Sequence, residues 1–332
     1  MIRKITVILM ATILAGITFS TASIAGNNAA KLNKKFKNLA SYERTLEEIA
    51  EQKDDAVVDL LSILEEAAAT DDIAMQRHKW MVKVTAMNLL GEIKNPAALK
   101  ILKTMLSESD NVSAIYNSAR TIGNIGGEKA FQILKKTLSD ANSNTCTYPV
   151  VRKKASILGL GLCGNAKAVS LLKAELTNKN NNKLTLIYTA GSLGMLGVKD
   201  GYDIALNSIN SADGKIQSSA IKALGLIGNP DVLALLSDIE LDGNNTIPRR
   251  AAKVAIAMIK SSRLNDDDNV NFLEIKLYNN PKMTEMVRWG TAKLKKINTN
   301  NSRRVLRDMG NNETPGYSSL RHAAALKFKT IK

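Results

Sequence analysis

Apolar residues recur along most of the chain at the three- and four-residue spacing of an amphipathic helix. One such set consists of Ala97, Ile101, Leu102 and Met105. This spacing places the apolar side chains on one face of a helix, where they can pack against a neighbour. No segment alternates apolar and polar residues in the way a half-buried strand does. The pattern therefore predicts an all-helical protein.

A short motif repeats within this pattern: a small residue, four further residues, an anchor glycine, one residue and an aliphatic residue. The anchor positions are Gly91, Gly123, Gly161, Gly194, Gly225 and, with alanine in place of glycine, Ala257. Successive anchors are 32, 38, 33, 31 and 32 residues apart, and a degenerate seventh copy lies near 294–297. Small residues let two helices approach closely, so their regular recurrence predicts a stack of similar helix pairs.

Prolines and asparagines indicate where these helices begin. Pro96 and Pro230 each follow an anchor and stand directly after an asparagine, Asn95 or Asn229. Proline fits the first turn of a helix, where its missing N–H has no partner to lose, and an asparagine side chain can accept from the first free amides. The remaining prolines precede anchors, at Pro149, Pro248, Pro281 and Pro315. The prolines therefore predict helix starts rather than helix breaks.

The repeat resembles the HEAT repeat, most closely the short bilin-lyase-like variety of bacterial proteins. Such repeats run Val-Arg-x-x-Ala-Ala-x-Ala-Leu-Gly-x-Ile-Gly-Asp-Pro, and residues 216–230 read Ile-Gln-Ser-Ser-Ala-Ile-Lys-Ala-Leu-Gly-Leu-Ile-Gly-Asn-Pro. The resemblance covers about residues 76–310. It implies a right-handed α-α superhelix, a HEAT-like solenoid of about six to seven helix pairs with N-terminal cap helices. It implies little about function.

The N-terminus has the features of a secretory signal peptide at residues 1–25. Arg3 and Lys4 precede an apolar run over residues 5–19, and Ser23-Ile24-Ala25 offers a small-x-small cleavage site before Gly26. The alternative is an uncleaved anchor, although the run is shorter than the ~20 residues that span a bilayer. We expect export, to the periplasm or exterior of a bacterium, with no transmembrane span after cleavage. Beyond the signal we expect a basic linker and the start of the first helix at 26–42, acidic cap helices at 43–75 and the repeat array at 76–332.

Charge is distributed unevenly over the expected mature chain. The net charge is +15, and loss of Arg3 and Lys4 with the signal peptide lowers it to +13. Residues 43–74 carry eleven acidic residues against two basic ones, whereas residues 280–332 carry twelve basic residues against three acidic ones. Because a solenoid keeps its ends apart, we expect these clusters not to neutralise each other within one molecule. Each is then a solvated end, or the two meet head to tail between molecules.

The basic charge bears on the choice of partner. Export argues against nucleic acid, and 4% aromatic residues leave few surfaces for stacking bases. An acidic protein or peptide, or an anionic envelope polymer or lipid, remains. In HEAT arrays the second helix of each unit lines the concave face, so the resemblance implies a basic inner track there. Its residues are Lys83, Arg120, Arg152, Lys153, Lys222, Arg249, Arg250 and Arg288. The alternative is an ordinary solvated helix face.

Residues with catalytic or ligand-binding chemistry are scarce. Gly159 to Gly164 match the dinucleotide fingerprint by letter, but a repeat helix explains them and no strand precedes them. His78 and His322 lie at opposite ends of the array. The run Asp266 to Asp268 lacks the spacing of a calcium loop and is expected to be a solvated loop. We therefore predict no cofactor, no metal and no enzymatic activity; a lyase activity would depend on the repeat resemblance alone.

The cysteines and the large aromatic residues have structural interpretations. Cys146 and Cys163 lie at opposite ends of one expected helix, ~20 Å apart, so we expect free thiols rather than a disulfide. Trp80 and Trp289 are expected to pack in the core or under a cap, with a binding-interface role for Trp289 as the alternative.

Overall fold

The computed structural model describes residue 48 and residues 51–65, 73–242 and 246–331. Over these residues the chain forms 16 α-helices and three short 3-10 helices, without a β-strand. The predicted all-α solenoid is confirmed. The expected signal peptide, the linker and most of the first cap helix lie outside the described residues.

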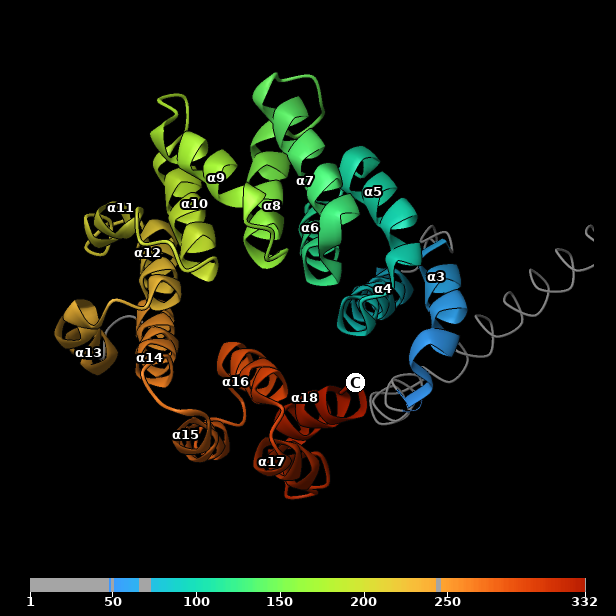
Figure 1. Cartoon of the computed structure of the whole chain (residues 1–332), viewed down its shortest axis with the longest axis vertical. Coiled ribbons are helices and arrows are strands. Elements are labelled where there is room, and N and C mark those ends of the chain that lie inside the picture. The colour runs from blue at the N-terminus through green and yellow to red at the C-terminus, as the bar shows by residue number, and fades with distance from the viewer. Residues whose placement is uncertain (1–47, 49–50, 66–72, 243–245, 332) are drawn as a thin grey trace, which may run out of the picture.

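The helices form two concentric layers that curve into a ring (Figure 1). The helices that carry the repeat anchors make the inner layer: α4 (Ile73–Ile93), α6 (Val112–Ile125), α8 (Pro149–Leu162), α10 (Lys183–Met195), α12 (Gly214–Ile227), α14 (Thr246–Ser261) and α16 (Thr284–Ile297). The outer layer consists of α3 (Val57–Glu65), α5 (Leu99–Glu108), α7 (Gly127–Asn142), α9 (Lys167–Thr177), α11 (Tyr202–Leu206), α13 (Leu233–Leu241), α15 (Asp266–Tyr278) and α17 (Asn300–Gly310). The chain ends with α18 (Ser318–Lys329), which packs against α16 and α17.

The anchor glycines are required by close packing between successive inner helices. A Cβ added at Gly123 would lie 2.5 Å from the carbonyl oxygen of Gly159, and one added at Gly225 would lie 2.7 Å from the Cα of Ala255. Gly159 and Ala255 each stand two residues before the next anchor, so the contact repeats from unit to unit. A larger side chain at an anchor would force adjacent inner helices apart.

Helix starts follow the prediction at Pro96, Pro149, Pro230 and Pro248, whereas Pro281 and Pro315 lie three residues before α16 and α18. The side chain of Asn95 accepts from the backbone N–H of Ala97 at 2.9 Å, and Asn229 caps a second 3-10 helix in the same way. These are η2 (Pro96–Ala98) and η3 (Pro230–Val232); η1 (Lys53–Ala56) precedes α3. The run Asp266 to Asp268 is the first turn of α15 rather than a solvated loop. Asn265 caps that turn, and acidic groups there complement the helix dipole.

The two ends of the described chain meet, which contradicts the expectation that a solenoid keeps them apart. The carboxylate of Glu92 on α4 pairs with Lys295 on α16 at 2.9 Å and also with Lys327 on α18. Leu326 packs against the N-terminal hydrophobic cluster, and Lys329 pairs with Glu51 at 2.9 Å. Figure 1 shows α18 returning to the neighbourhood of α3 and α4. The curvature accumulated over the repeats therefore closes a ring, and the pair of Lys329 with Glu51 joins the basic end to the acidic end within one molecule.

The aromatic and cysteine side chains have structural roles. Trp80 packs against the N-terminal cluster and Trp289 against the C-terminal cluster. Cys163 is buried at the end of α8, Cys146 is half-buried, and both are free. Burial raises the pKa of the Cys163 thiol, as expected for a small core residue.

Candidate functional site

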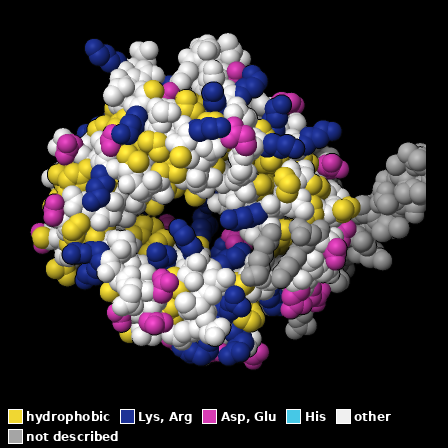
Figure 2. Space-filling view, in the orientation of Figure 1, with side chains coloured by type: hydrophobic (Ala, Val, Ile, Leu, Met, Phe, Trp, Pro, Cys, Tyr) yellow, Lys and Arg dark blue, Asp and Glu magenta, His cyan; other side chains and the backbone are white. Residues whose placement is uncertain are grey.

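The inner helices surround a central opening with lysine and arginine side chains at its rim (Figure 2). A cavity of about 400 Å³ lies on this inner surface, where α14 and α16 diverge and α16 packs instead against α15, α17 and α18. Its cationic lining consists of Arg120 from α6, Lys222 from α12, Arg250 from α14 and Arg288 from α16. We call these four residues the basic quartet. They come from four different repeats and belong to the predicted inner track.

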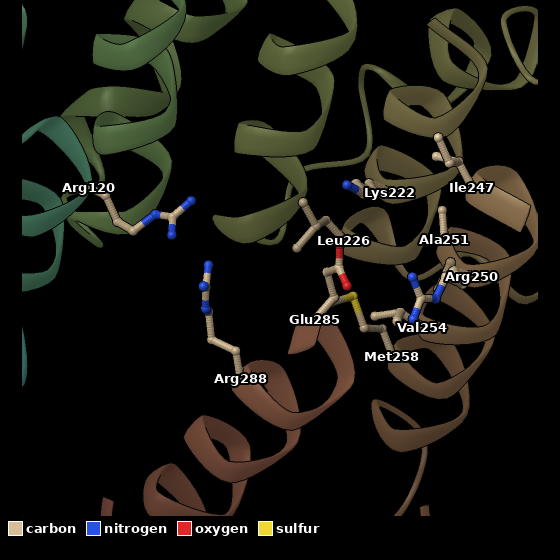
Figure 3. Close-up of a pocket in the computed structure, with 11 residues that line it drawn as sticks. Arg120, Lys222, Leu226, Ile247, Arg250, Ala251, Val254, Met258, Glu285 and Arg288 are labelled. Atoms are coloured by element: carbon tan, nitrogen blue, oxygen red, sulfur yellow. The ribbon is translucent and has the colours of Figure 1, made fainter. Parts of the chain in front are cut away.

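Arg120 and Arg288 point toward one another across the opening (Figure 3). Burial and the nearby charge of Arg288 lower the pKa of the Arg120 guanidinium, and Tyr188 only partly offsets this. Among the described residues, no hydrogen bond or ion pair engages the side chain of any member of the basic quartet. The ring therefore concentrates positive charge that the described part of the protein does not neutralise.

The rest of the lining combines apolar groups with one acidic residue. Leu226, Val254 and Met258 contribute apolar surface, and Glu285 contributes the single carboxylate. With four cations and one anion, the lining has a net charge of +3. A site of this composition suits a ligand that carries negative charge and some apolar surface.

Arg249 lies in an adjacent, smaller cavity of about 310 Å³. This cavity is also lined by Arg250 and Lys253 from α14, together with Glu240 and Met283. Because Arg250 belongs to both cavities, the positive surface continues from the central opening around α14 toward α13.

Arg152 does not belong to the inner surface, and its assignment to the track is wrong. The side chain is fully buried, and its Nε donates to the carbonyl oxygen of Leu106 at 2.9 Å. Its other nitrogens donate to the backbone oxygens of Ser109 and Thr147. A fork of five donors suits three converging carbonyl oxygens, so Arg152 connects α8 to the end of α5.

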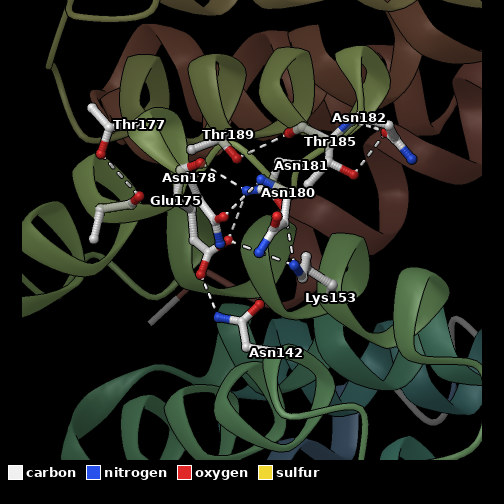
Figure 4. A network of polar contacts seen from close by, with 11 residues as sticks. Asn142, Lys153, Glu175, Thr177, Asn178, Asn180, Asn181, Asn182, Thr185 and Thr189 are labelled. Carbon is white, nitrogen blue, oxygen red and sulfur yellow. Dashed lines mark hydrogen bonds and ion pairs between the residues drawn. The ribbon is translucent and has the colours of Figure 1, made fainter.

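Lys153 is held in a polar network near the C-terminal ends of α7 and α9 (Figure 4). Its ammonium donates to Asn181 at 2.9 Å and lies 4.0 Å from the buried carboxylate of Glu175. Asn142 and Asn181 also donate to Glu175, so the network ties α7, α8 and α9 to the loop before α10. Lys83 has a comparable role, because it donates to the carbonyl oxygen of Leu64 and joins α4 to α3.

The position of a basic residue relative to the anchor distinguishes the residues that line the central cavity from those that contact other elements. Arg120 and Lys222 stand three residues before an anchor, and Arg250 stands seven before Ala257. These positions are four apart and share a helix face. Lys83, Lys153 and Arg249 stand eight before an anchor and project elsewhere, the two lysines into contacts with neighbouring elements and Arg249 into the adjacent cavity. By this register Lys154, omitted from the track, matches Arg250. Burial and the nearby Lys215 lower the pKa of Lys154.

The described residues offer neither a metal-binding cluster nor a membrane-spanning helix. No group of three or more histidine, cysteine, aspartate or glutamate side chains in that part of the chain could hold a metal ion. None of its helices combines the length and apolar character needed to cross a bilayer.

Comparison with known proteins places the repeats in a family. A family model for HEAT repeats matches residues 72–152. Among solved structures, the chain is similar to human deoxyhypusine hydroxylase in complex with glycerol. The similarity covers 73% of this chain and 98% of that chain, with 16% identity and a TM-score of 0.31. No curated protein matches the sequence.

The match to a hydroxylase corrects our prediction that the chain is not an enzyme. The absence of a recognisable catalytic motif does not by itself exclude catalysis. A TM-score of 0.31 equally gives no argument for that activity here. Residues 72–152 match HEAT repeats, and paired helices with the same anchor spacing recur through the rest of the described chain.

Proposed function

We propose that this chain is an exported scaffold that holds an acidic segment of a partner protein in its central opening. The observation that carries the proposal is the basic quartet, which places four cations around one cavity without a partner for them in the described structure. An acidic segment would supply the missing negative charge. Export follows from the signal-like residues 1–25, and HEAT repeats in general mediate protein interactions.

The ring form favours an extended segment over a membrane surface. The quartet faces the interior of the ring, and a flat lipid surface could reach only the rim of the opening. A narrow extended chain can enter between the inner helices and meet all four cations. A flexible anionic polymer is the competing ligand, and it would bind by charge alone, without preference for a peptide backbone or sequence.

The test is binding of a fluorescently labelled oligoglutamate peptide, followed by anisotropy at low and physiological salt. We expect the double substitution Lys222→Glu and Arg250→Glu to weaken binding at least about tenfold, equivalent to ~1.4 kcal/mol. The matched control reverses Lys100 and Lys103, two exposed lysines of the outer helix α5. If both double variants lost the same affinity for the peptide, net charge alone would explain the effect, and the proposal would be contradicted.

Selectivity separates the peptide from the polymer. Dextran sulfate, a flexible polyanion without a peptide backbone, is added as a competitor at equal charge concentration. A partner segment recovered by crosslinking in intact cells should outcompete it and bind with one-to-one stoichiometry. If every polyanion binds alike and the crosslinked segment shows no preference, the polymer alternative replaces the acidic segment.

A further inference from the structure

The two arginines that face each other across the opening form an unusual pair. Arg120 from α6 and Arg288 from α16 line one cavity and point toward one another, and the charge of Arg288 contributes to the lowered pKa of Arg120 (Figure 3). Like charges repel, so the arrangement costs free energy in the ligand-free protein. A bridging anion would convert that repulsion into two attractive contacts.

We propose that Arg120 and Arg288 bind one phosphomonoester dianion between them, carried by the acidic segment that the opening holds. A guanidinium presents parallel N–H donors that match a pair of oxygens. A single carboxylate has two oxygens and one charge, which suit one such fork. A phosphomonoester has three terminal oxygens and a charge between −1.5 and −2, so it can serve two forks and neutralise both.

The surroundings of the pair fit an organic phosphate better than a bare ion. Lys222 and Arg250 supply two more cations in the same cavity, where further acidic groups of the segment can bind. Leu226 and Met258 offer apolar surface to the carbon atoms that carry the phosphate. Glu285 opposes the anion, and Glu285→Gln is therefore expected to strengthen binding.

This inference rests on the proposed function and is tested separately from it. Wild-type protein is titrated calorimetrically with inorganic phosphate, with an acidic peptide containing one phosphoserine, and with the same peptide unphosphorylated. We expect the phosphopeptide to bind at least about tenfold more tightly than its unphosphorylated form. Inorganic phosphate should bind weakly but saturably, and acetate at equal ionic strength should not. Tighter binding of inorganic phosphate than of the phosphopeptide would show that the source is free phosphate rather than the segment, which overturns the inference.

Substitutions at the pair distinguish a binding role from a structural one. Arg120→Gln and Arg288→Gln should each abolish the preference for the phosphopeptide. Because each also relieves repulsion, neither should lower the melting temperature of the ligand-free protein. Lys103→Gln on α5 is the control for lost charge and should retain the preference.

The outcomes separate this inference from the proposed function. If the unphosphorylated peptide binds and phosphorylation adds nothing, the inference fails while the proposed function stands. If the phosphopeptide binds equally well to wild type and to both glutamine variants, the assignment to Arg120 and Arg288 is wrong.

Discussion

The carboxylate of Glu92 lies 2.9 Å from the ammonium of Lys295, although 203 residues separate them in sequence. Lys327 reaches the same carboxylate from α18. Burial alone would raise the pKa of Glu92, but the two lysines outweigh it and hold the pKa below its ordinary value. This ion-pair cluster connects the first inner helix, α4, to α16 and α18. It closes the ring on the side opposite α10 and α12.

We therefore predict that Glu92→Gln weakens ring closure at neutral pH. Two ammonium groups would lose their carboxylate in a partly buried site. The cost should be about 1–3 kcal/mol, between the values for exposed and fully buried pairs. Denaturant unfolding gives the stability change. Small-angle scattering should show a larger radius of gyration if the ring opens. Glu128→Gln, which removes the carboxylate of an exposed pair with Lys167, is the control and should change neither measurement appreciably.

The same cluster predicts the direction of a pH effect. A carboxyl with a lowered pKa in the folded state stabilises the protein fully above its unfolded pKa of about 4.3 and loses that contribution as the pH falls further. The difference in unfolding free energy between wild type and Glu92→Gln should thus be constant at neutral pH and shrink in acid. A difference that grows with acidification would contradict the assigned role of Glu92.

A second prediction concerns the anchor glycines. Gly225→Ala places a methyl group 2.7 Å from the Cα of Ala255, so the inner helices α12 and α14 must separate. We expect a loss of about 1–3 kcal/mol, the usual cost of overpacking. The control lies in the same helix: at Gly214 an added Cβ meets nothing within 4 Å. Gly214→Ala should be neutral or stabilise by up to ~1 kcal/mol. Equal melting temperatures for the two variants would contradict the packing argument.

A third prediction separates Arg152 from the basic quartet. Arg152→Ala leaves the buried carbonyl oxygen of Leu106 and the partly buried one of Ser109 without their donor. We expect a loss of about 3–5 kcal/mol in unfolding free energy, since hydrogen bonds from a charged donor are each worth ~1.5–3 kcal/mol. Arg250→Ala, on the exposed inner surface, should change stability by less than ~0.5 kcal/mol but weaken binding of the acidic peptide. A larger loss of unfolding free energy for Arg250→Ala than for Arg152→Ala, measured by chemical denaturation, would contradict the structural role of Arg152.

A fourth prediction concerns the N-terminus. The Ser23-Ile24-Ala25 site predicts that the mature protein begins at Gly26. Intact-mass measurement on protein purified from its native host checks this. Ala25→Arg places a large charged residue where cleavage needs a small one, and should leave the precursor uncut. A native protein that keeps residues 1–25 would remove the basis for proposing export.

Much of the fold follows from local effects that can be recognised in the sequence, namely small residues at helix contacts and asparagine caps at helix starts. Small residues recur at the anchors because inner helices must touch, and Asn95 and Asn229 start helices because their side chains satisfy free amides. Both effects act over a few residues or between neighbouring units. The sequence therefore predicts the helix pairs and their order, and the resemblance to HEAT repeats implies the inner position of the anchor helices. It also predicts that basic residues recur on those helices.

The closed ring depended on relationships that no local pattern contains. Small rotations between successive units add up over the whole array, and only their sum brings Glu92 to Lys295. The same accumulated rotation brings Arg120 to face Arg288. The sequence assigns both residues to the inner track but does not indicate that they face each other. Arg152 and Lys153 belonged to that track by residue type, yet converging carbonyl oxygens and a buried carboxylate hold them elsewhere. The sequence by itself determined the repeat and its charge, whereas the accumulated curvature and the distribution of buried polar partners decided which charges meet.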